Sequence, residues 1–455
     1  MSTDTVPISP TTTRTAPPRR ATRASVVDTL RFPLLVWVLH FLLTQIPASL
    51  AYRFGEIRSV ERINGIIEQQ DGQLSSAYQM VRPPLGGMAH WLVEPFRNWD
   101  GTWYALVAER SYSPDMSATA AFFPLYPWLM DWVSRLTGWS VETVGYLVSN
   151  LAFAGALIVL YKLVRIDFDD RVARWTLVAL AVFPTAFFFS AIYTESLFLL
   201  VSVTCLWAAR RNDWLLAAIM GFLAAMTRSA GIMLLAPLAV LFIQQHGWDL
   251  RRWFPKALLA LIPPLGLVVF GWFLTTKDLR FLDWQAQQWQ WNRFSATPWR
   301  TFDCALNGCV ANVRGFGGPY VDTVDPVNFG WIGDLFRNLN WAYITSSEFR
   351  YTVGQSQVLD LLVTVAAIAL ILIGLKKVPL YYTAWVVPPM IVPLLAPSSV
   401  FPLMSMPRFV LPLFPLFVVA VLLIKDRRVG IVLASISAVL LVLLTMQFAL
   451  WYWVA

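Results

Sequence analysis

A single acidic residue, Asp100, stands among aromatic residues in segment 98–104 (NWDGTWY). An Asp before a Gly often serves in an ordinary turn or helix cap. The nearby segment 121–127 (AFFPLYP) is too short to cross a membrane and too apolar for a free loop. We expect it to lie in the membrane interface or dip into the membrane, packed over Asp100. In that setting the carboxylate can take a proton from a substrate hydroxyl.

Three more charged residues are each the only Asp, Glu, Lys or Arg of a hydrophobic stretch: Glu195 in 175–209, Arg228 in 214–245 and Arg408 in 378–424. A charge in hydrocarbon costs several kcal/mol, so it normally faces a protein interior or wet cavity and marks a functional site. The alternative is that both arginines reach outward to the lipid headgroups and Glu195 pairs with one of them.

Arg228 interrupts an apolar stretch of about 32 residues, which as one helix would be about 48 Å long, too long for a membrane without strong tilt. We therefore predict two short helices that meet at a polar turn. Such a turn presents an arginine and backbone amides to an anion such as phosphate. Arg408 likewise begins a span directly after a Pro-rich external stretch.

One external carboxylate, two arginines at the membrane surface and the lack of a metal motif suit one reaction in particular. A sugar carried on a polyprenyl phosphate has a leaving group that is already an anion, so cations stabilise it and no carboxylic acid is needed. The carboxylate takes the proton of an acceptor hydroxyl while the arginines hold the phosphate. This single displacement inverts the anomeric centre, unlike most glycosidases, which require two carboxylates.

The elements that position these residues are membrane helices. Of the 455 residues 57% are hydrophobic and 14% charged, against about 25% charged in soluble domains, which excludes a soluble protein. The net charge of +8 is scattered rather than gathered in a stripe, so we expect no nucleic-acid partner. Because a span needs about 20 residues, we predict an all-α polytopic membrane protein with eleven transmembrane helices, near 30–51, 143–163, 174–192, 194–209, 214–228, 230–245, 257–275, 356–375, 379–398, 409–424 and 429–450.

The basic residues fix the orientation of these spans. Those between spans fall on one side together with the basic tail 1–28, which we expect to be disordered, and this side is predicted to be cytoplasmic. Residues 29–455 then form one membrane domain that begins with an uncleaved anchor. Two long loops, 52–142 and 276–355, lie outside the cytoplasm, and the active site is expected there.

The second external loop carries six tryptophans that suit either an interfacial belt or platforms for sugar rings: Trp284, Trp289, Trp291, Trp299, Trp331 and Trp341. Cys304 and Cys309, five residues apart in this loop, are a plausible disulfide. The three histidines, His40, His90 and His246, lie far apart without metal-ligand spacing. We predict neither a metal nor another cofactor.

Five segments in order resemble the PIG-V family of mannosyltransferases, which includes the enzyme that adds the second mannose in GPI-anchor assembly, and its bacterial relatives. They are NWDGTWY with the AERSY that follows, AFFPLYP, FPTAFFFSAIYTESLF at 183–198, AAMTRSAGIMLLAPL at 224–238 and MPRFVLPLFPLF at 406–417. The resemblance implies a GT-C-type glycosyltransferase with its active site on the non-cytoplasmic face and a polyprenyl- or dolichyl-phosphate mannose donor.

By position, Asp100 matches the acidic residue of the family's first external loop and would be the base. We expect the donor phosphate and substrate to be held by Arg228, Arg408, Glu195, Trp99, Tyr104, Tyr126 and Arg293. Loop 276–355 matches only weakly, through Gln288, Trp289 and Arg293. The acceptor, a glycolipid or glycan, therefore stays open, as does a partner subunit. The tail and the lack of an ER-retention signal suit a bacterial plasma membrane.

Two alternatives remain at this point. A lipid-linked-sugar transporter or flippase would share the intramembrane charges, although such proteins often show internal repeats and no convincing repeat is found here. A GT-C enzyme that uses another polyprenyl-phosphate sugar differs from the mannosyltransferase only through the family resemblance.

Overall fold

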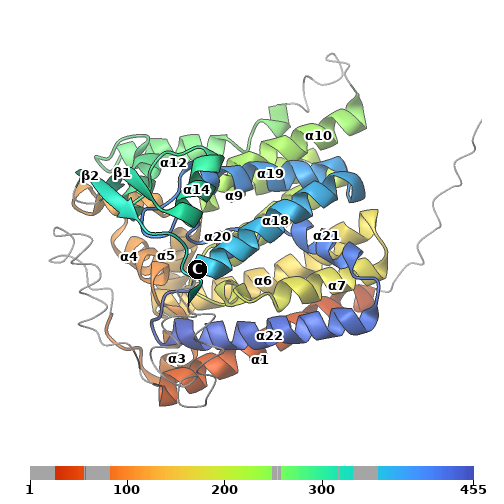
Figure 1. Cartoon of the computed structure of the whole chain (residues 1–455), viewed down its shortest axis with the longest axis horizontal. Coiled ribbons are helices and arrows are strands. Elements are labelled where there is room, and N and C mark those ends of the chain that lie inside the picture. Colours follow the sequence, from red (N-terminus) through yellow and green to blue (C-terminus); the bar gives the residue numbers. More distant parts are fainter. Residues whose placement is uncertain are drawn as a thin grey trace, which may run out of the picture.

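The computed structural model describes residues 26–55, 57, 82–247, 254, 258–315, 318–330 and 357–454. Most of tail 1–28, and also Trp331 and Trp341, lie outside these residues. The longest helices run alongside one another and form the body of the molecule (Figure 1): α1 (Val26–Phe54), α6 (Val141–Asp167), α18 (Gln357–Lys377) and α22 (Arg427–Ala449).

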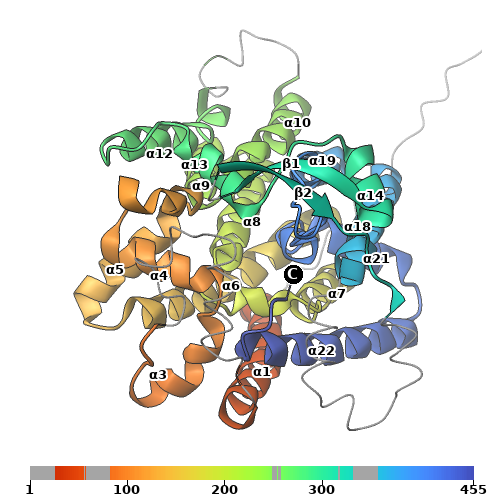
Figure 2. The same ribbon diagram turned by 60° about the vertical axis from the view of Figure 1, so that its left-hand side comes forward.

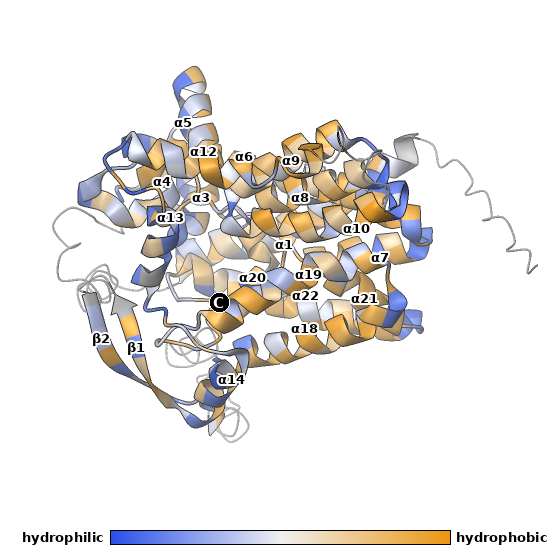
Figure 3. Cartoon of the chain, turned by 90° about the horizontal axis from the view of Figure 1, so that it is seen from above, coloured by the Kyte–Doolittle hydropathy of each residue, from blue (hydrophilic) through white to orange (hydrophobic). Residues whose placement is uncertain are grey.

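Shorter helices complete this body: α7 (Asp170–Ala181), η3 (Ala186–Phe189), α8 (Glu195–Arg210), α9 (Trp214–Thr227), η4 (Ser229–Leu234), α10 (Leu235–His246), α12 (Leu265–Thr275), α19 (Leu380–Leu395), α20 (Met406–Phe409) and α21 (Pro415–Leu423). Within the described residues, five helical stretches are long and apolar enough to cross a membrane: Thr29–Phe54, Val141–Asp167, Ser229–His246, Gln357–Lys377 and Arg427–Ala449. Hydrophobic residues form a broad band across the helices, with hydrophilic residues beyond it (Figure 3). A multi-pass helical membrane protein is confirmed, while eleven spans remain a prediction.

The basic turns between helices share one end of the bundle, as expected. Arg210, the last residue of α8, donates to Asp167 at the end of α6 over 2.9 Å, and Arg171 donates to the backbone oxygen of Lys425 over 3.1 Å. Aspartates cap the helices that begin here; Asp169, for example, accepts from the amide of Val172 over 2.8 Å. The predicted cytoplasmic orientation of this end remains a prediction.

The opposite end carries the segments predicted to lie in the two external loops (Figure 2). They are α3 (Gly87–Leu92), η1 (Glu94–Phe96), α4 (Asp100–Arg110), η2 (Pro114–Ala121), α5 (Leu125–Thr137), α13 (Asp283–Ala286), η5 (Gln287–Trp291), α14 (Pro298–Asn307), β1 (Cys309–Gly315) and β2 (Gly318–Val324).

The antiparallel strands β1 and β2 depart from the predicted all-α fold. Their hairpin begins at Cys309, which is disulfide-bonded to Cys304 of α14, so the plausible disulfide is confirmed. Phe294, Ala311, Val313 and Val324 form a small hydrophobic core beneath the hairpin. A hairpin suits a loop outside the membrane, because the open edges of a two-stranded sheet need water or a partner for their backbone groups.

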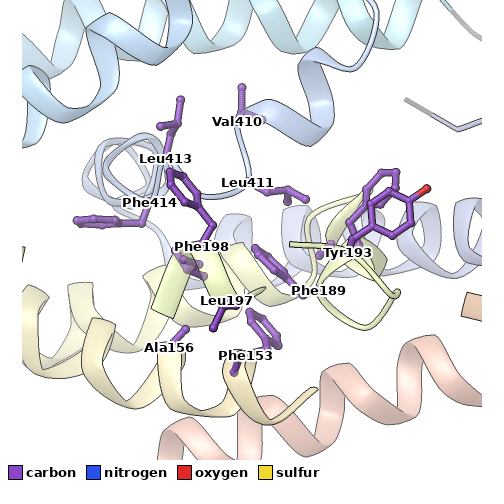
Figure 4. Packing of buried hydrophobic residues seen from close by; sticks show 14 of the residues in the cluster. Phe153, Ala156, Phe189, Tyr193, Leu197, Phe198, Val410, Leu411, Leu413 and Phe414 are labelled. Atoms are coloured by element: carbon purple, nitrogen blue, oxygen red, sulfur yellow. The ribbon is translucent and has the colours of Figure 1, made fainter. Parts of the chain in front are cut away.

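Two predicted spans are interrupted, and the prediction of continuous helices over 174–192 and 409–424 is wrong. α7 ends at Ala181 just before Pro184, and prolines at 412 and 415 separate α20 from α21. Proline removes a backbone donor and clashes with the preceding turn, so helices stop near it. Segment 185–194 is nevertheless buried, packed between α6 and residues 410–414 (Figure 4). Its hydrophobic side chains therefore pack in the protein interior and do not face lipid.

Candidate active site

Four charged side chains from distant parts of the sequence form one continuous chain of ion pairs. Arg408 Nη1 lies 2.5 Å from Asp100 Oδ2, and Arg408 Nε bonds Glu195 Oε1. The same Glu195 oxygen accepts from Arg228 Nη1 over 2.6 Å. Glu195 is fully buried and Arg408 nearly so, whereas the Asp100 side chain keeps 17% of its surface exposed. Asp100 is therefore the more accessible carboxylate of the two.

Asp100 is the first residue of α4, and a sharp backbone turn precedes it. Trp99 has φ of 57°, a conformation that is costly for a bulky residue and often occurs at functional sites. The turn is held by Tyr193, whose hydroxyl accepts from the Asp100 amide over 3.1 Å and donates to the Asn98 carbonyl over 3.2 Å. The ring of Tyr193 also lies 4.7 Å from the Arg408 guanidinium.

The two arginines sit at breaks between helices. α9 ends at Thr227, Arg228 has an extended backbone, and η4 begins at Ser229, so the predicted polar turn is confirmed. Arg408 lies in the short helix α20, which is fastened to the segment before α8 by a 3.0 Å hydrogen bond from the Thr185 hydroxyl to the Pro407 carbonyl. These breaks bring both guanidinium groups to Glu195, at the first turn of α8.

Arg293 joins this group from the second external loop. Its guanidinium lies 5.8 Å from the Phe409 ring, and that of Arg228 lies 5.9 Å from the same ring. Arg293 donates to the Ala396 carbonyl over 2.7 Å, and no carboxylate of the described chain pairs with it. Burial, together with the positive charge of Arg408, lowers the pKa of Arg293 to about 10. The cluster thus has one cation more than its two carboxylates balance.

Aromatic residues of the first external loop pack beside the ion-pair chain. Tyr104 is buried, with its hydroxyl 3.3 Å from that of Thr194, and burial together with the charge of Glu195 raises its pKa to about 12. Phe122 of AFFPLYP stacks on Trp103, one turn after Asp100, with ring centroids 5.5 Å apart. The segment therefore packs on α4, the helix that begins with Asp100, while its packing over Asp100 itself stays a prediction.

Two predicted substrate-binding residues lie farther from the charges. The hydroxyl of Tyr126 points toward α6, where it bonds the Gly145 carbonyl and the Ser149 hydroxyl at 2.8 Å each, so its ring supports Tyr104 from behind. The ring of Trp99 packs on Trp451 and Trp453, with centroids 5.9 and 5.2 Å away. Both positions suit residues that shape the pocket, and direct substrate contact stays a prediction for them.

Sequence reasoning did not single out Tyr193, Asn98 or Phe409. Asn98 ties the loop to the end of α22 by donating to the Phe448 carbonyl over 2.8 Å. All three lie next to predicted site residues or within the motifs quoted above. This position in the sequence was the only feature that could have indicated them. In the part of the chain that the structure describes, no group of three or more His, Cys, Asp or Glu residues could hold a metal ion.

Parts of the chain are similar to known proteins. Residues 119–274 match the family described as dolichyl-phosphate-mannose-protein mannosyltransferase. A stretch of 152 residues is 28% identical to GPI mannosyltransferase 2 of Drosophila pseudoobscura pseudoobscura, covering 30% of this chain and 33% of that protein. Over this part of its length the chain is similar to mannosyltransferases. The predicted resemblance is thus confirmed over part of the chain. The match spans about a third of the curated relative.

The matched region does not contain the whole site. It includes Glu195, Arg228 and AFFPLYP, whereas Asp100, Arg293 and Arg408 lie outside residues 119–274. ArnT from Cupriavidus metallidurans, solved with undecaprenyl phosphate bound, aligns over 93% of this chain and 77% of its own, with 13% identity and a TM-score of 0.38.

Proposed function

We propose that this chain is an inverting glycosyltransferase that moves mannose from a polyprenyl-phosphate donor to a lipid-linked or glycan acceptor on the non-cytoplasmic face of a membrane. The observation that carries the proposal is the chain of Asp100, Arg408, Glu195 and Arg228. It sets one accessible carboxylate against buried arginines at helix breaks, at the end of the bundle opposite to the basic turns.

The excess positive charge supports an anionic substrate at this site. Arg293 has a lowered pKa because it is buried near another cation, and a phosphate beside it would relieve that repulsion. In our proposal the donor phosphate binds Arg293, Arg228 and Arg408. Arg408 then exchanges its bond to Asp100 for one to the phosphate, while Glu195 keeps Arg408 and Arg228 aligned. The Asp100 carboxylate is thereby freed for the acceptor.

An apolar groove near the arginines supports a long hydrocarbon on that phosphate. The groove has a volume of about 280 Å³ and is formed by α7, α18, α21 and α22. Val410, two residues after Arg408, lines it, and Ile424 lines its other end near the basic turns. We place the polyprenyl tail in this groove, with its phosphate at the end lined by Val410.

The reaction itself forms one bond and breaks one. The acceptor oxygen attacks the anomeric carbon, and the bond from that carbon to the phosphate oxygen breaks with its electron pair on the phosphate. Asp100 takes the proton of the acceptor hydroxyl, and the arginines stabilise the added charge on the phosphate. Glu195 stays paired with two arginines, which leaves Asp100 as the one free carboxylate of the cluster, so we propose a scheme without a metal.

The test is label transfer from radioactive polyprenyl-phosphate mannose to native lipid extract by purified full-length protein. We expect wild type to transfer label and Asp100→Asn to lose transfer. Asp131→Asn, which removes an exposed carboxylate of α5 paired with Arg135, is the matched control and should keep it. GDP-mannose, in extract without enzymes that convert it, should not serve as donor.

Two outcomes would contradict the proposal. If a folded Asp100→Asn variant transferred label at the wild-type rate, Asp100 would be excluded as the base. Movement of labelled lipid across sealed vesicles without transfer, unchanged in Asp100→Asn, would favour the transporter. Label accepted from another polyprenyl-phosphate sugar but not from mannose would keep the mechanism and change the sugar.

A further inference from the structure

A second charged pocket lies at the opposite end of the bundle, among the basic turns. It has a volume of about 430 Å³ and lies between α1, α6 and α8, lined by Thr29, Tyr161, Lys162, Arg165, Ile166, Trp207, Arg210 and Arg211. Four of these eight residues are cations and none is acidic. The proposed transfer reaction uses none of them.

Two of the four cations have no carboxylate partner in the described part of the chain. Arg165 lies 3.5 Å from Asp170 and Arg210 lies 2.9 Å from Asp167. Lys162 and Arg211 instead lie over the ring of Trp207, at 6.0 and 4.7 Å from its centroid. An indole ring attracts cations but does not neutralise them. The pocket therefore attracts an anion.

The position of the pocket indicates which kind of anion. Its walls are the ends of α1 and α6, two of the helices that are long and apolar enough to cross a membrane. Ile166, at its rim, is 40% exposed, and tryptophan beside basic residues is typical of the headgroup level of a bilayer. A headgroup phosphate would meet the cations there while the acyl chains stay beside the apolar helices.

We infer that this pocket binds the phosphodiester of an anionic glycerophospholipid, held by Lys162 and Arg211 and bordered by Trp207. Arginine binds phosphate with two parallel hydrogen bonds, and lysine adds a compact charge. Because α1, α6 and α8 all contribute to the pocket, the bound lipid stabilises their packing at this end. The inference does not depend on the proposed reaction.

The experiment measures lipid binding to the purified full-length protein in detergent. Native mass spectrometry and thermal unfolding are recorded with phosphatidylglycerol, with phosphatidylcholine and with inorganic phosphate. We expect wild type to retain phosphatidylglycerol and to unfold at a higher temperature in its presence. The double variant Lys162→Gln/Arg211→Gln should bind it at least tenfold more weakly. Lys376→Gln/Lys377→Gln, which removes the same charge from the end of α18, should bind as wild type does.

The charge-preserving variant Lys162→Arg/Arg211→Lys should retain binding, which separates loss of charge from misfolding. If the α18 control lost as much phosphatidylglycerol binding, general surface charge would explain the effect and the proposed site would be wrong. Equal binding of phosphatidylcholine would overturn the preference for an anionic headgroup. Competition by inorganic phosphate at the affinity of the lipid would assign the pocket to a free anion instead.

Discussion

The two ends of the helix bundle both join their helices by ion pairs, but they bury them to different extents. In the candidate active site, the side chains of Glu195 and Arg408 are 0% and 8% exposed. At the other end, Arg165 of α6 and Asp170 of α7 lie 3.5 Å apart with 24% and 43% of their side chains exposed. Exposed pairs contribute little and cost little to lose, whereas buried pairs cost desolvation to form and are strongly destabilising when one partner is removed.

The difference indicates what each set of charges is for. A bundle that needed only fastening could use exposed pairs, as it does around Asp170. Placing two arginines and a carboxylate in the interior gains less stability than well-packed apolar residues would. We interpret the buried set as retained for binding an anion, and the exposed set as structural.

The largest effect is expected for Glu195→Gln. The substitution keeps the shape of the side chain but removes the buried charge that pairs with both Arg408 and Arg228, at a cost of about 3–5 kcal/mol in the free energy of unfolding. Thermal unfolding in detergent, read by size-exclusion fluorescence, measures it. If the loss of unfolding free energy were no larger than that caused by removing an exposed pair, the two ends would not differ in the way we describe.

Asp100→Asn is expected to affect the reaction more than the fold. A general base contributes about 10²- to 10⁴-fold to rate, so the transfer rate should fall by that factor. Its unfolding temperature should fall less than that of Glu195→Gln, because Arg408 keeps Glu195 as partner. Rate and unfolding temperature are measured on the same preparations. If the loss of transfer rate followed the loss of unfolding temperature in the same proportion in both variants, Asp100 would be a structural charge as well.

Arg293→Gln should weaken donor binding without destabilising the protein. One hydrogen bond to a charged group is worth about 1.5–3 kcal/mol, so the donor KM should rise about 10-fold or more. The free protein should unfold at the same or a higher temperature, because the variant removes a buried cation that lies near Arg408. Arg293→Lys, which keeps the charge, is the control. Unchanged KM in Arg293→Gln would remove Arg293 from the phosphate site.

The smallest effect is expected for Asp170→Asn at the other end. The exposed pairs with Arg174 and Arg165 should contribute within about 1 kcal/mol to stability, and transfer should stay at the wild-type rate. The same unfolding and transfer assays apply. A loss as large as that of Glu195→Gln would mean that exposure does not distinguish the two ends.

The sequence predicted the charged part of the site because charges in apolar stretches are costly and must find partners. For that reason Glu195, Arg228 and Arg408 could be grouped before their distances were known. Tyr193 could not be grouped with them, because placing a tyrosine in an aromatic-rich segment carries no unusual free-energy cost and so gives no signal. Arg293 was named only through the family resemblance. Its place depends on backbone bonds such as that from the Phe294 amide to the Pro397 carbonyl, a long-range pairing with no local signal.

The fold was predictable to the same degree. Helices were expected at α1, α6, α8, α9, α18 and α22, and all are present, because a long apolar run in a membrane must satisfy its backbone internally. The breaks after α7 and α20 were missed. An apolar run packed inside the protein has the same composition as one facing lipid, and only its prolines distinguish them. The hairpin β1–β2 was missed because its strands are short and lie in a polar loop.

The hydrogen bond from Asn98 to Phe448 spans 350 residues of sequence and holds the turn that presents Asp100. The chain is synthesised from its N-terminus, so the segment with Asp100 is made long before α22. Until α22 has been inserted and docked on α1, the turn lacks this anchor. The turn that presents Asp100 is therefore synthesised early and fixed in place last, so the site that we propose is complete only when the whole bundle is.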